Sequence, residues 1–267
     1  MSFFYLDTYI LIMKGIFMKN ITVGIPRALH YYKYKTLWTT FFKELGINIL
    51  LSPYTNEEII NNGRKILNNR LCLFIQIYFG HVNYLKDKVD YILMSSIDND
   101  CPCYNFLYDI VSNTFDINIL NLKMKDEEES FLNLGKQLGI NKQTILNAYK
   151  IAKKEEYKQK KINYLLDLKR LKKSTKKTLV IGKEYMYKDN FIINKLFNDS
   201  NIDFFYSNSI NPDIKPYKKA ILSNICSIRN EVNKTIVIST RPCVLKNTIL
   251  NNKIKGKLIN IEEIIDG

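Results

Sequence analysis

The sequence predicts an α/β fold with two Rossmann-like parallel-sheet domains joined by a helical segment. Two observations carry this prediction. Short β-branched runs alternate with longer stretches whose apolar residues recur at helical spacing, which is typical of parallel sheets covered by helices. Between the two alternating halves, residues 126–173 show a helical pattern alone. The predicted organisation is an N-terminal extension, a first Rossmann-like domain, a helical connector and a second, smaller Rossmann-like domain, at residues 1–18, 19–125, 126–176 and 177–267.

The first domain is predicted to open with a strand over residues 21–25 and a helix over residues 30–45, which Gly46 can close in a left-handed conformation. A second helix is expected over residues 56–68, because acidic residues in its first turn favour the helix dipole. The other strands of this domain are predicted at residues 47–51, 72–79 and 89–94, with one more around 118–121. A short helix or turn is expected at residues 83–87.

The second domain is predicted to begin after a polar joint at residues 172–177. The connector before this joint starts with Asp126 and three glutamates, which suit the first turn of a helix. The later strands are predicted at residues 178–181, 202–206, 235–239 and 258–261, and the helices at residues 191–198 and 218–232.

The charge of the chain allows two interpretations. Its formal net charge is +14, while 46% of the residues are hydrophobic and 12% aromatic, which argues against disorder. The excess of basic residues suits a partner with phosphates, such as nucleic acid or coenzyme A. It also fits a compositional origin, because Lys, Asn and Ile are used heavily throughout, as expected of an AT-rich genome. No RNA- or DNA-binding signature accompanies the charge, so no specific nucleic-acid partner is predicted.

The N-terminal residues 1–17 are apolar and aromatic, but they carry Asp7 and Lys14 and fall short of the roughly 20 apolar residues that span a bilayer. We expect Met18 to be the natural start, with no membrane partner; a weak membrane-surface anchor is the alternative. The five cysteines are scattered and follow no secretory signal, so a reducing cytoplasm is the expected location.

Cysteines follow two of the predicted strands. Cys101 and Cys103 flank a proline just after the strand at residues 89–94, and Cys243 follows the strand at residues 235–239. Loops at the carboxyl ends of strands are where open α/β sheets place their ligands. Thiolates are soft ligands for zinc and for iron–sulfur clusters, although a free cysteine is also among the most buried residue types. An inert cysteine therefore remains the alternative at each position.

Three thiolates from separate loops, Cys72, Cys101 and Cys243, could converge on one cleft and hold an iron–sulfur cluster. Zinc is less natural here, because close pairs of ligands are missing. Cys103 is an alternative to Cys101, and Cys226 lies in an apolar helical stretch that predicts a core position.

The candidate cofactor-binding residues are Arg27, His81 and Tyr185, and no catalytic residue is assigned. Arg27 could meet a phosphate or carboxylate at a helix N-terminus, or it could be a surface arginine. His81 could donate a hydrogen bond or a proton near the cleft, or it could be a turn histidine. Tyr185 is a possible cleft residue. Asp189 is expected at the surface and His30 at an ordinary helix start.

Two nucleotide-binding motifs are missing from the chain. It contains no complete glycine-rich dinucleotide fingerprint, so NAD is not predicted. It contains no Walker phosphate loop either, so it is not expected to be an ATP-hydrolysing activator.

Residues 23–32, Val-Gly-Ile-Pro-Arg-Ala-Leu-His-Tyr-Tyr, resemble the opening of proteins related to 2-hydroxyacyl-CoA dehydratases and their activators, the acyl-CoA dehydratase activase-related proteins. Further similar stretches follow in the same order, at residues 38–46, 51–56, 72–73, 79–82, 88–91, 101–109, 182–189 and 242–243. The resemblance covers residues 19–260 and is strongest before Asp109.

The resemblance implies two Rossmann-like domains with a [4Fe-4S] cluster at the cleft between them, and Cys72, Cys101 and Cys243 match the family cysteines. In related dehydratases such a cluster accepts one electron from an ATP-dependent activator and helps to remove water from a 2-hydroxyacyl thioester. The implied role is electron transfer or a dehydratase-associated subunit in anaerobic metabolism; an active enzyme would be a dehydratase-like lyase. The implied partners are an activator protein or a dehydratase subunit, and an acyl-CoA thioester.

The chain departs from the family pattern in its second half. A Gly-His-Pro-Tyr motif is replaced by Gly-Lys-Glu-Tyr at residues 182–185, and Val-Leu-Lys follows Cys243 in place of Gly-Pro-Asp. The alternative function is therefore that of a degenerate, cluster-free family member that acts as a protein-interaction scaffold.

Overall fold

The computed structural model describes residues 21–68, 71–96, 102–173, 177–196, 203–206, 234–240 and 257–266. The chain forms two compact units. The first comprises Met1–Pro53, Glu57–Leu71 and Ile75–Glu156, and the second comprises Tyr54–Asn56, Cys72–Phe74 and Tyr157–Gly267. Each unit contains a parallel sheet, so the predicted α/β class is confirmed. The predicted extension over residues 1–18 and the predicted helix over residues 218–232 lie outside the described residues.

The sheet of the first unit has four parallel strands in the order β2-β1-β3-β4. The strands are β1 (Thr22–Ile25), β2 (Asn48–Leu51), β3 (Tyr91–Ser96) and β4 (Asn118–Lys123). Gly24 of β1 lies opposite Leu50 on one side and Ile92 on the other. From β1, the sheet extends to β2 on one side and to β3 and β4 on the other. The direction of winding thus switches between β1 and β3.

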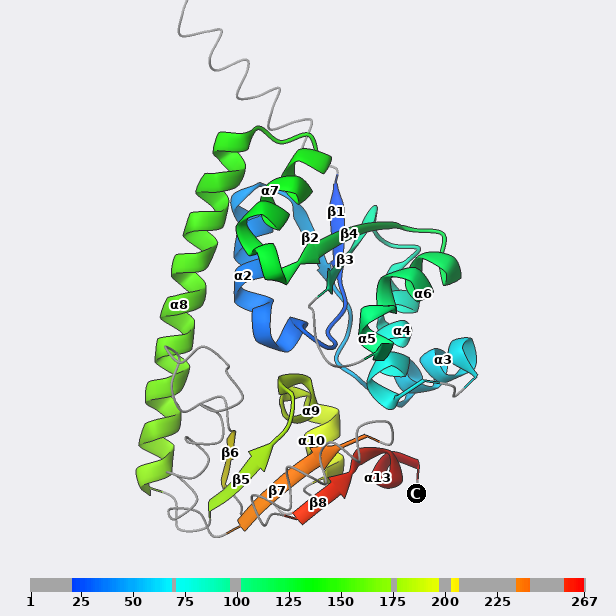
Figure 1. Ribbon diagram of the computed structural model, residues 1–267, viewed down its shortest axis with the longest axis vertical. Helices are drawn as coiled ribbons and strands as arrows, with labels where there is room; N and C mark the ends of the chain where they lie inside the picture. Colours follow the sequence, from blue (N-terminus) through cyan, green and yellow to red (C-terminus); the bar gives the residue numbers. More distant parts are fainter. Residues whose placement is uncertain are drawn as a thin grey trace, which may run out of the picture. The chain divides into compact units, whose positions relative to one another are not determined.

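Helices cover both faces of this sheet, with α2 and α7 on one side and α4 and α6 on the other (Figure 1). The helices are α2 (Tyr31–Glu44), α3 (Glu57–Leu67), α4 (Leu73–Leu85), α5 (Pro102–Asn105), α6 (Leu107–Thr114), the 3₁₀ turn η1 (Met124–Asp126), α7 (Glu127–Gln137) and α8 (Lys142–Lys173). Gly46, after α2, has φ +69°, which confirms the predicted left-handed cap. The helix α8 begins in the first unit and ends in the second.

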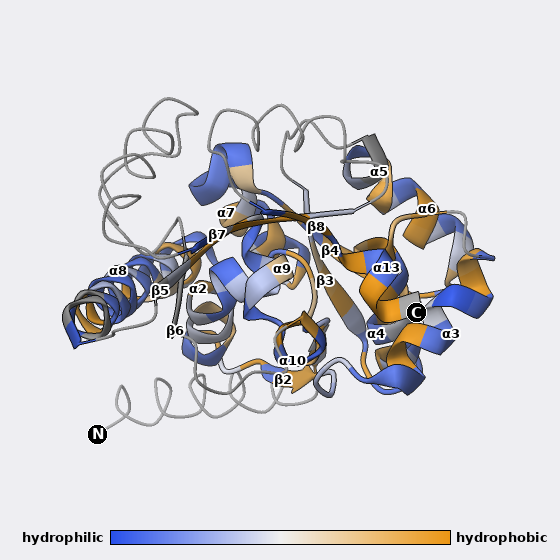
Figure 2. Ribbon diagram, turned by 90° about the horizontal axis from the view of Figure 1, so that it is seen from below, coloured by the Kyte–Doolittle hydropathy of each residue, from blue (hydrophilic) through white to orange (hydrophobic). Residues whose placement is uncertain are grey.

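An apolar cluster of the first unit lies on the side of α2, α7 and the first half of α8. Its aromatic rings pack edge to face or tilted, with 4.6 Å between the ring centroids of Phe41 and Phe131 and 5.2 Å between those of Phe131 and Tyr149. Figure 2 shows β3 coloured as hydrophobic, as expected for an inner parallel strand that is buried on both faces. This core holds the sheet against its helices and leaves its carboxyl edge to polar residues.

The predicted strand over residues 72–79 is wrong, because this segment forms α4, which runs on to Leu85. Residues Phe74, Ile75, Ile77, Tyr78 and Phe79 are all buried, so the segment is apolar around much of its circumference. A short apolar run of this kind does not distinguish a buried strand from a buried helix by its period. The predicted turn over residues 83–87 is in part the last turn of this helix.

The sheet of the second unit also has four parallel strands, in the order β6-β5-β7-β8. The strands are β5 (Lys177–Ile181), β6 (Asp203–Tyr206), β7 (Lys234–Ser239) and β8 (Lys257–Asn260), and the described helices that belong to this unit alone are α9 (Glu184–Lys188), α10 (Asn190–Leu196) and α13 (Ile261–Asp266). Leu179 lies opposite Phe205 on one side and Thr235 on the other. Within the described part of the chain, none of the helices combines the length and the hydrophobicity that crossing a bilayer requires.

Candidate functional site at the carboxyl edge of the first sheet

The switch in winding direction between β1 and β3 opens the carboxyl edge of the first sheet at that point, where α/β proteins commonly bind ligands. The loop after β1 passes through Leu29, which is buried and has φ +50°. A branched residue rarely adopts this left-handed conformation, and such strain is concentrated at binding and catalytic sites. The loop then delivers His30 to the start of α2.

His30, Ser95 and Tyr104 form a hydrogen-bonded group at this edge, although they come from the residue before α2, from β3 and from α5. The hydroxyl of Tyr104 donates to the backbone carbonyl of Ser95 and also contacts Nδ1 of His30. The Ser95 hydroxyl lies 3.1 Å from the Tyr104 hydroxyl and 3.3 Å from Nδ1 of His30. The rings of His30 and Tyr104 meet edge to face at 4.6 Å.

This pattern is compatible with one tautomer of a neutral His30. Tyr104 has a single hydroxyl proton, and the Ser95 carbonyl, which cannot donate, accepts it. The contact between Tyr104 and His30 is then made by Nδ1–H donating to the phenol oxygen. A neutral imidazole with its proton on Nδ1 satisfies these contacts.

Arg27 and His81 lie at the same edge. The backbone N–H of Arg27 donates to the hydroxyl of Ser52, 2.8 Å away, and Ser52 is fully buried just after β2. His81 is fully buried on α4. Burial and, to a smaller extent, the nearby charge of Arg27 together lower the pKa of His81 to about 3. His81 is therefore neutral at physiological pH, while Arg27 supplies a fixed positive charge.

The structure thus brings together two of the three predicted cofactor-binding residues, Arg27 and His81, in one unit. The third, Tyr185, belongs to the second unit, where its side chain is buried and its ring packs edge to face on Phe74, with 4.8 Å between the ring centroids. Packing accounts for this position without a ligand. His30, predicted as an ordinary helix-start residue, is indeed the residue before α2, but it also belongs to the hydrogen-bonded group.

Asp189 is not at the surface as predicted, because it is 3% exposed. One of its carboxylate oxygens accepts the backbone N–H groups of Phe191 and Ile192, at 3.0 and 3.4 Å, and caps α10. The other oxygen accepts the hydroxyl of Thr55, at 2.5 Å, within the second unit. A buried aspartate is stabilised by such a set of donors.

Of the predicted metal ligands, Cys72 is described, and it lies just before α4 with a partly exposed side chain. Cys101 and Cys243 lie outside the described residues, as does Cys226, and only the backbone of Cys103 is placed, in α5. Three thiolates suit an iron–sulfur cluster chemically, and the side chain of Cys72 is partly exposed. Within the described residues, no three His, Cys, Asp or Glu side chains gather as metal ligands do.

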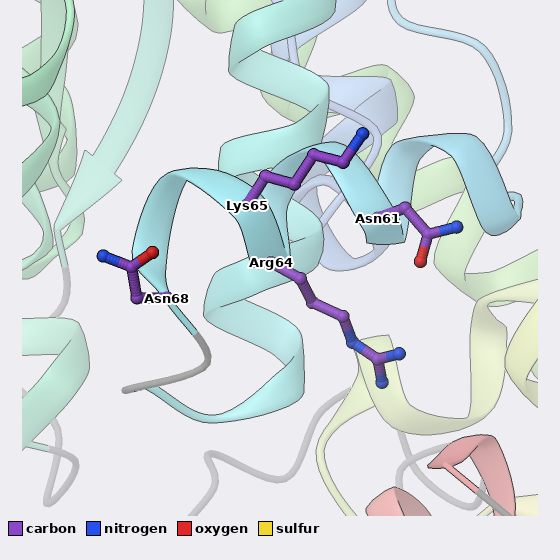
Figure 3. A pocket seen from close by; sticks show the side chains of 4 residues that line it. All are labelled: Asn61, Arg64, Lys65 and Asn68. Carbon is purple, nitrogen blue, oxygen red and sulfur yellow. The ribbon is translucent and has the colours of Figure 1, made fainter.

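A shallow surface pocket of about 530 Å³ lies on α3, lined by Asn61, Arg64, Lys65 and Asn68 (Figure 3). Figure 3 shows the side chains of Arg64 and Lys65 pointing in different directions. Arg64 also donates from Nε to the side-chain oxygen of Gln76, at 3.4 Å. The pocket is basic, but its cations do not converge on a common point.

Sequence reasoning missed Ser52, Ser95, Tyr104 and Tyr78 at the carboxyl edge. Ser52 and Ser95 had a usable signal, because each stands at the end of a predicted strand. Tyr104 follows Cys101 and Cys103 closely in the sequence, and the prediction for this segment used only the two cysteines. Tyr78 was missed because residues 72–79 were predicted as a strand, so its position three residues before His81 on one helix was not recognised.

The first unit is thus an α/β module of the Rossmann-like class, whose strand order β2-β1-β3-β4 switches direction between β1 and β3. The chain belongs to the family described as "CoA enzyme activase uncharacterised domain (DUF2229)", whose model matches residues 22–210. This agrees with the resemblance to acyl-CoA dehydratase activase-related proteins. No curated protein matches the chain.

Several solved structures show a weak likeness. A nickel-bound structure of FpvC from P. aeruginosa is 12% identical, with 91% of this chain and 86% of that chain covered and a TM-score of 0.33. The laminin-binding protein Lbp of Streptococcus pyogenes is 12% identical, with 90% and 88% covered and a TM-score of 0.32. Likenesses at these scores support no conclusion about the present chain.

Proposed function

We propose that this chain is an iron–sulfur protein related to 2-hydroxyacyl-CoA dehydratases, with a role in electron transfer or as a dehydratase-associated subunit. The observation that carries the proposal is membership of the CoA enzyme activase family, together with a cysteine-bearing segment attached to the ligand-binding edge of the first sheet. That segment leads from Ser96, the last residue of β3, to Tyr104, and it contains Cys101 and Cys103.

In this proposal Cys72, Cys101 and Cys243 supply the thiolate ligands, with Cys103 as the alternative to Cys101. A bound cluster would supply one-electron transfer. Tyr104, which follows Cys103 in the sequence, is hydrogen-bonded to the Ser95 carbonyl and to His30. Arg27 contributes positive charge that suits an anionic substrate or cofactor group. The partners would be an ATP-dependent activator or a dehydratase subunit, and an acyl-CoA thioester.

One experiment separates this function from a cluster-free scaffold. The chain is purified without oxygen and assayed for iron, acid-labile sulfide and visible absorbance. We expect a brown protein with about four irons per chain. A colourless, iron-free protein with an unchanged fold would instead support the scaffold.

Single serine variants then test the ligands. Cys72→Ser, Cys101→Ser and Cys243→Ser should each lower the iron content and bleach the absorbance, because serine is a poor ligand for iron–sulfur clusters. Cys226→Ser is the matched control, since its sequence context predicts a core position. Equal iron content in Cys101→Ser and wild type, with Cys103→Ser depleted, would move the assignment to Cys103.

A further inference from the structure

Tyr78 carries a buried hydroxyl on α4 for which the described residues provide no hydrogen-bond partner. Its side chain is 4% exposed. Burial raises the pKa of Tyr78, and Tyr104 adds to the shift, so the phenol keeps its proton at neutral pH. A buried donor without a partner lowers stability, and ligand-binding sites are one of the few places where such a donor is retained.

The surroundings of Tyr78 define what it could bind. Tyr78 and His81 are three residues apart on α4 and share one face of the helix. His81 lies near Arg27, and Tyr78 lies near Tyr104, which contacts His30. This face of α4 is thus turned towards the carboxyl edge of the first sheet, where one guanidinium and a neutral phenol donor occur together.

We propose that this edge binds the carboxylate group of a small organic acid, with the Tyr78 hydroxyl donating to one carboxylate oxygen and Arg27 supplying the opposite charge. A carboxylate accepts hydrogen bonds only, and it matches both a neutral phenol donor and a guanidinium. The inference goes beyond the iron–sulfur proposal, since it involves no cysteine. Loss of either proposal leaves the other intact.

The chain offers a direct reporter, because both of its histidines, His30 and His81, lie at this edge. The full-length protein, labelled on its histidine rings, is titrated at neutral pH with sodium acetate while the ring resonances are followed by NMR. Sodium chloride at equal ionic strength serves as the blank, and acetamide and inorganic phosphate are the comparison probes. We expect a saturable shift with acetate that is at least tenfold weaker with acetamide, which lacks the charge.

Tyr78→Phe is the decisive variant, because phenylalanine keeps the packed ring and removes only the hydroxyl. We expect acetate to bind about five- to tenfold more weakly, the usual effect of one lost hydrogen bond, while the melting temperature stays equal or rises. The control is Tyr108→Phe on α6, whose side chain is 40% exposed and which should bind acetate as wild type does.

Three outcomes would overturn the proposal. The first is a titration with acetate that shows no saturation beyond the sodium chloride blank. The second is a Tyr78→Phe variant that binds acetate as tightly as wild type. The third is tighter binding of inorganic phosphate than of acetate, which would assign the edge to phosphate instead.

Discussion

The first unit contains two helix pairs that are joined in different ways, α3 with α4 and α7 with α8. Between α3 and α4 the backbones themselves touch. A Cβ atom added at Gly63 would lie 1.8 Å from the carbonyl oxygen of Gln76, and one added at Gly80 would lie 1.9 Å from that of Ile59. No side chain longer than hydrogen fits at either glycine without moving a helix.

Side chains make the contact between α7 and α8. The three atoms nearest to a Cβ atom added at Gly135 would all belong to the side chain of Ile145, with Cγ1 at 2.5 Å. Lys153 of α8 pairs with Glu127 at 2.8 Å and with Glu156 at 3.0 Å. Burial disfavours the charged form of Lys153, but the hydrogen bonds to Glu127 and Glu156 outweigh it and raise the pKa of Lys153.

The comparison shows which helix contact in this unit can tolerate a substitution. Side chains can change rotamer and accommodate a substitution, whereas two touching backbones have no such freedom. The rigid contact holds α4, which carries Tyr78 and His81 to the candidate site. The adjustable contact holds the side of the sheet that carries the apolar core.

The largest effect is expected for Gly80→Ala. Alanine favours a helix over glycine by about 1 kcal/mol, but here the clash with the Ile59 carbonyl must push α3 and α4 apart. We expect the free energy of unfolding to fall by about 3 kcal/mol or more, measured by urea denaturation. The control is Gly135→Ala, in which the side chain of Ile145 rather than a backbone must shift, so the loss should be smaller, about 1 to 2 kcal/mol. Equal losses in the two variants would refute the distinction between the contacts.

His81 gives a second test, through pH. The pKa of His81 is about 3 in the folded protein and near 6.5 in the unfolded chain. Between pH 3 and pH 6.5, His81 is therefore protonated in the unfolded chain and neutral in the folded protein. The stability that His81 contributes is complete above pH 6.5 and falls as pH drops, by up to about 1.4 kcal/mol per unit. His81→Leu removes this term. The difference in unfolding free energy between wild type and variant should therefore slope with pH between 6 and 4, and parallel curves would contradict the assignment.

Most of the sheet could be predicted from the sequence, and α4 shows why part of it could not. The β-branched runs that became β1, β5 and β7 are short and bounded by Gly, Pro or polar residues. The run that became α4 is equally apolar, and its continuation past Gly80 to Leu85 was the one sign of helical length. Gly80 was read as the end of a strand, although the fold uses it for close helix contact.

The sequence predicted two residues of the candidate site, but it did not predict the hydrogen bonds that join the other residues there. Arg27 and His81 were found because each follows a glycine or proline near the end of an apolar run. The links from Tyr104 to Ser95 and His30 join residues that are 9 and 74 positions apart, and no local pattern encodes such pairs. Tyr185 shows the converse, since a residue chosen for its place in a family motif packs against Phe74.

The smallest expected effect concerns the adjustable contact, through Tyr149→Phe. The Tyr149 hydroxyl donates to Glu127 at 2.7 Å, and burial with this hydrogen bond raises the pKa of Tyr149. The variant keeps the ring that packs on Phe131, and Glu127 keeps its ion pair with Lys153. We therefore expect a loss of only about 1 kcal/mol in the free energy of unfolding. Tyr157→Phe, at an exposed position on α8, should change it by less than about 0.5 kcal/mol. A loss from Tyr149→Phe as large as that from Gly80→Ala would show that the α7–α8 contact is as rigid as the α3–α4 contact.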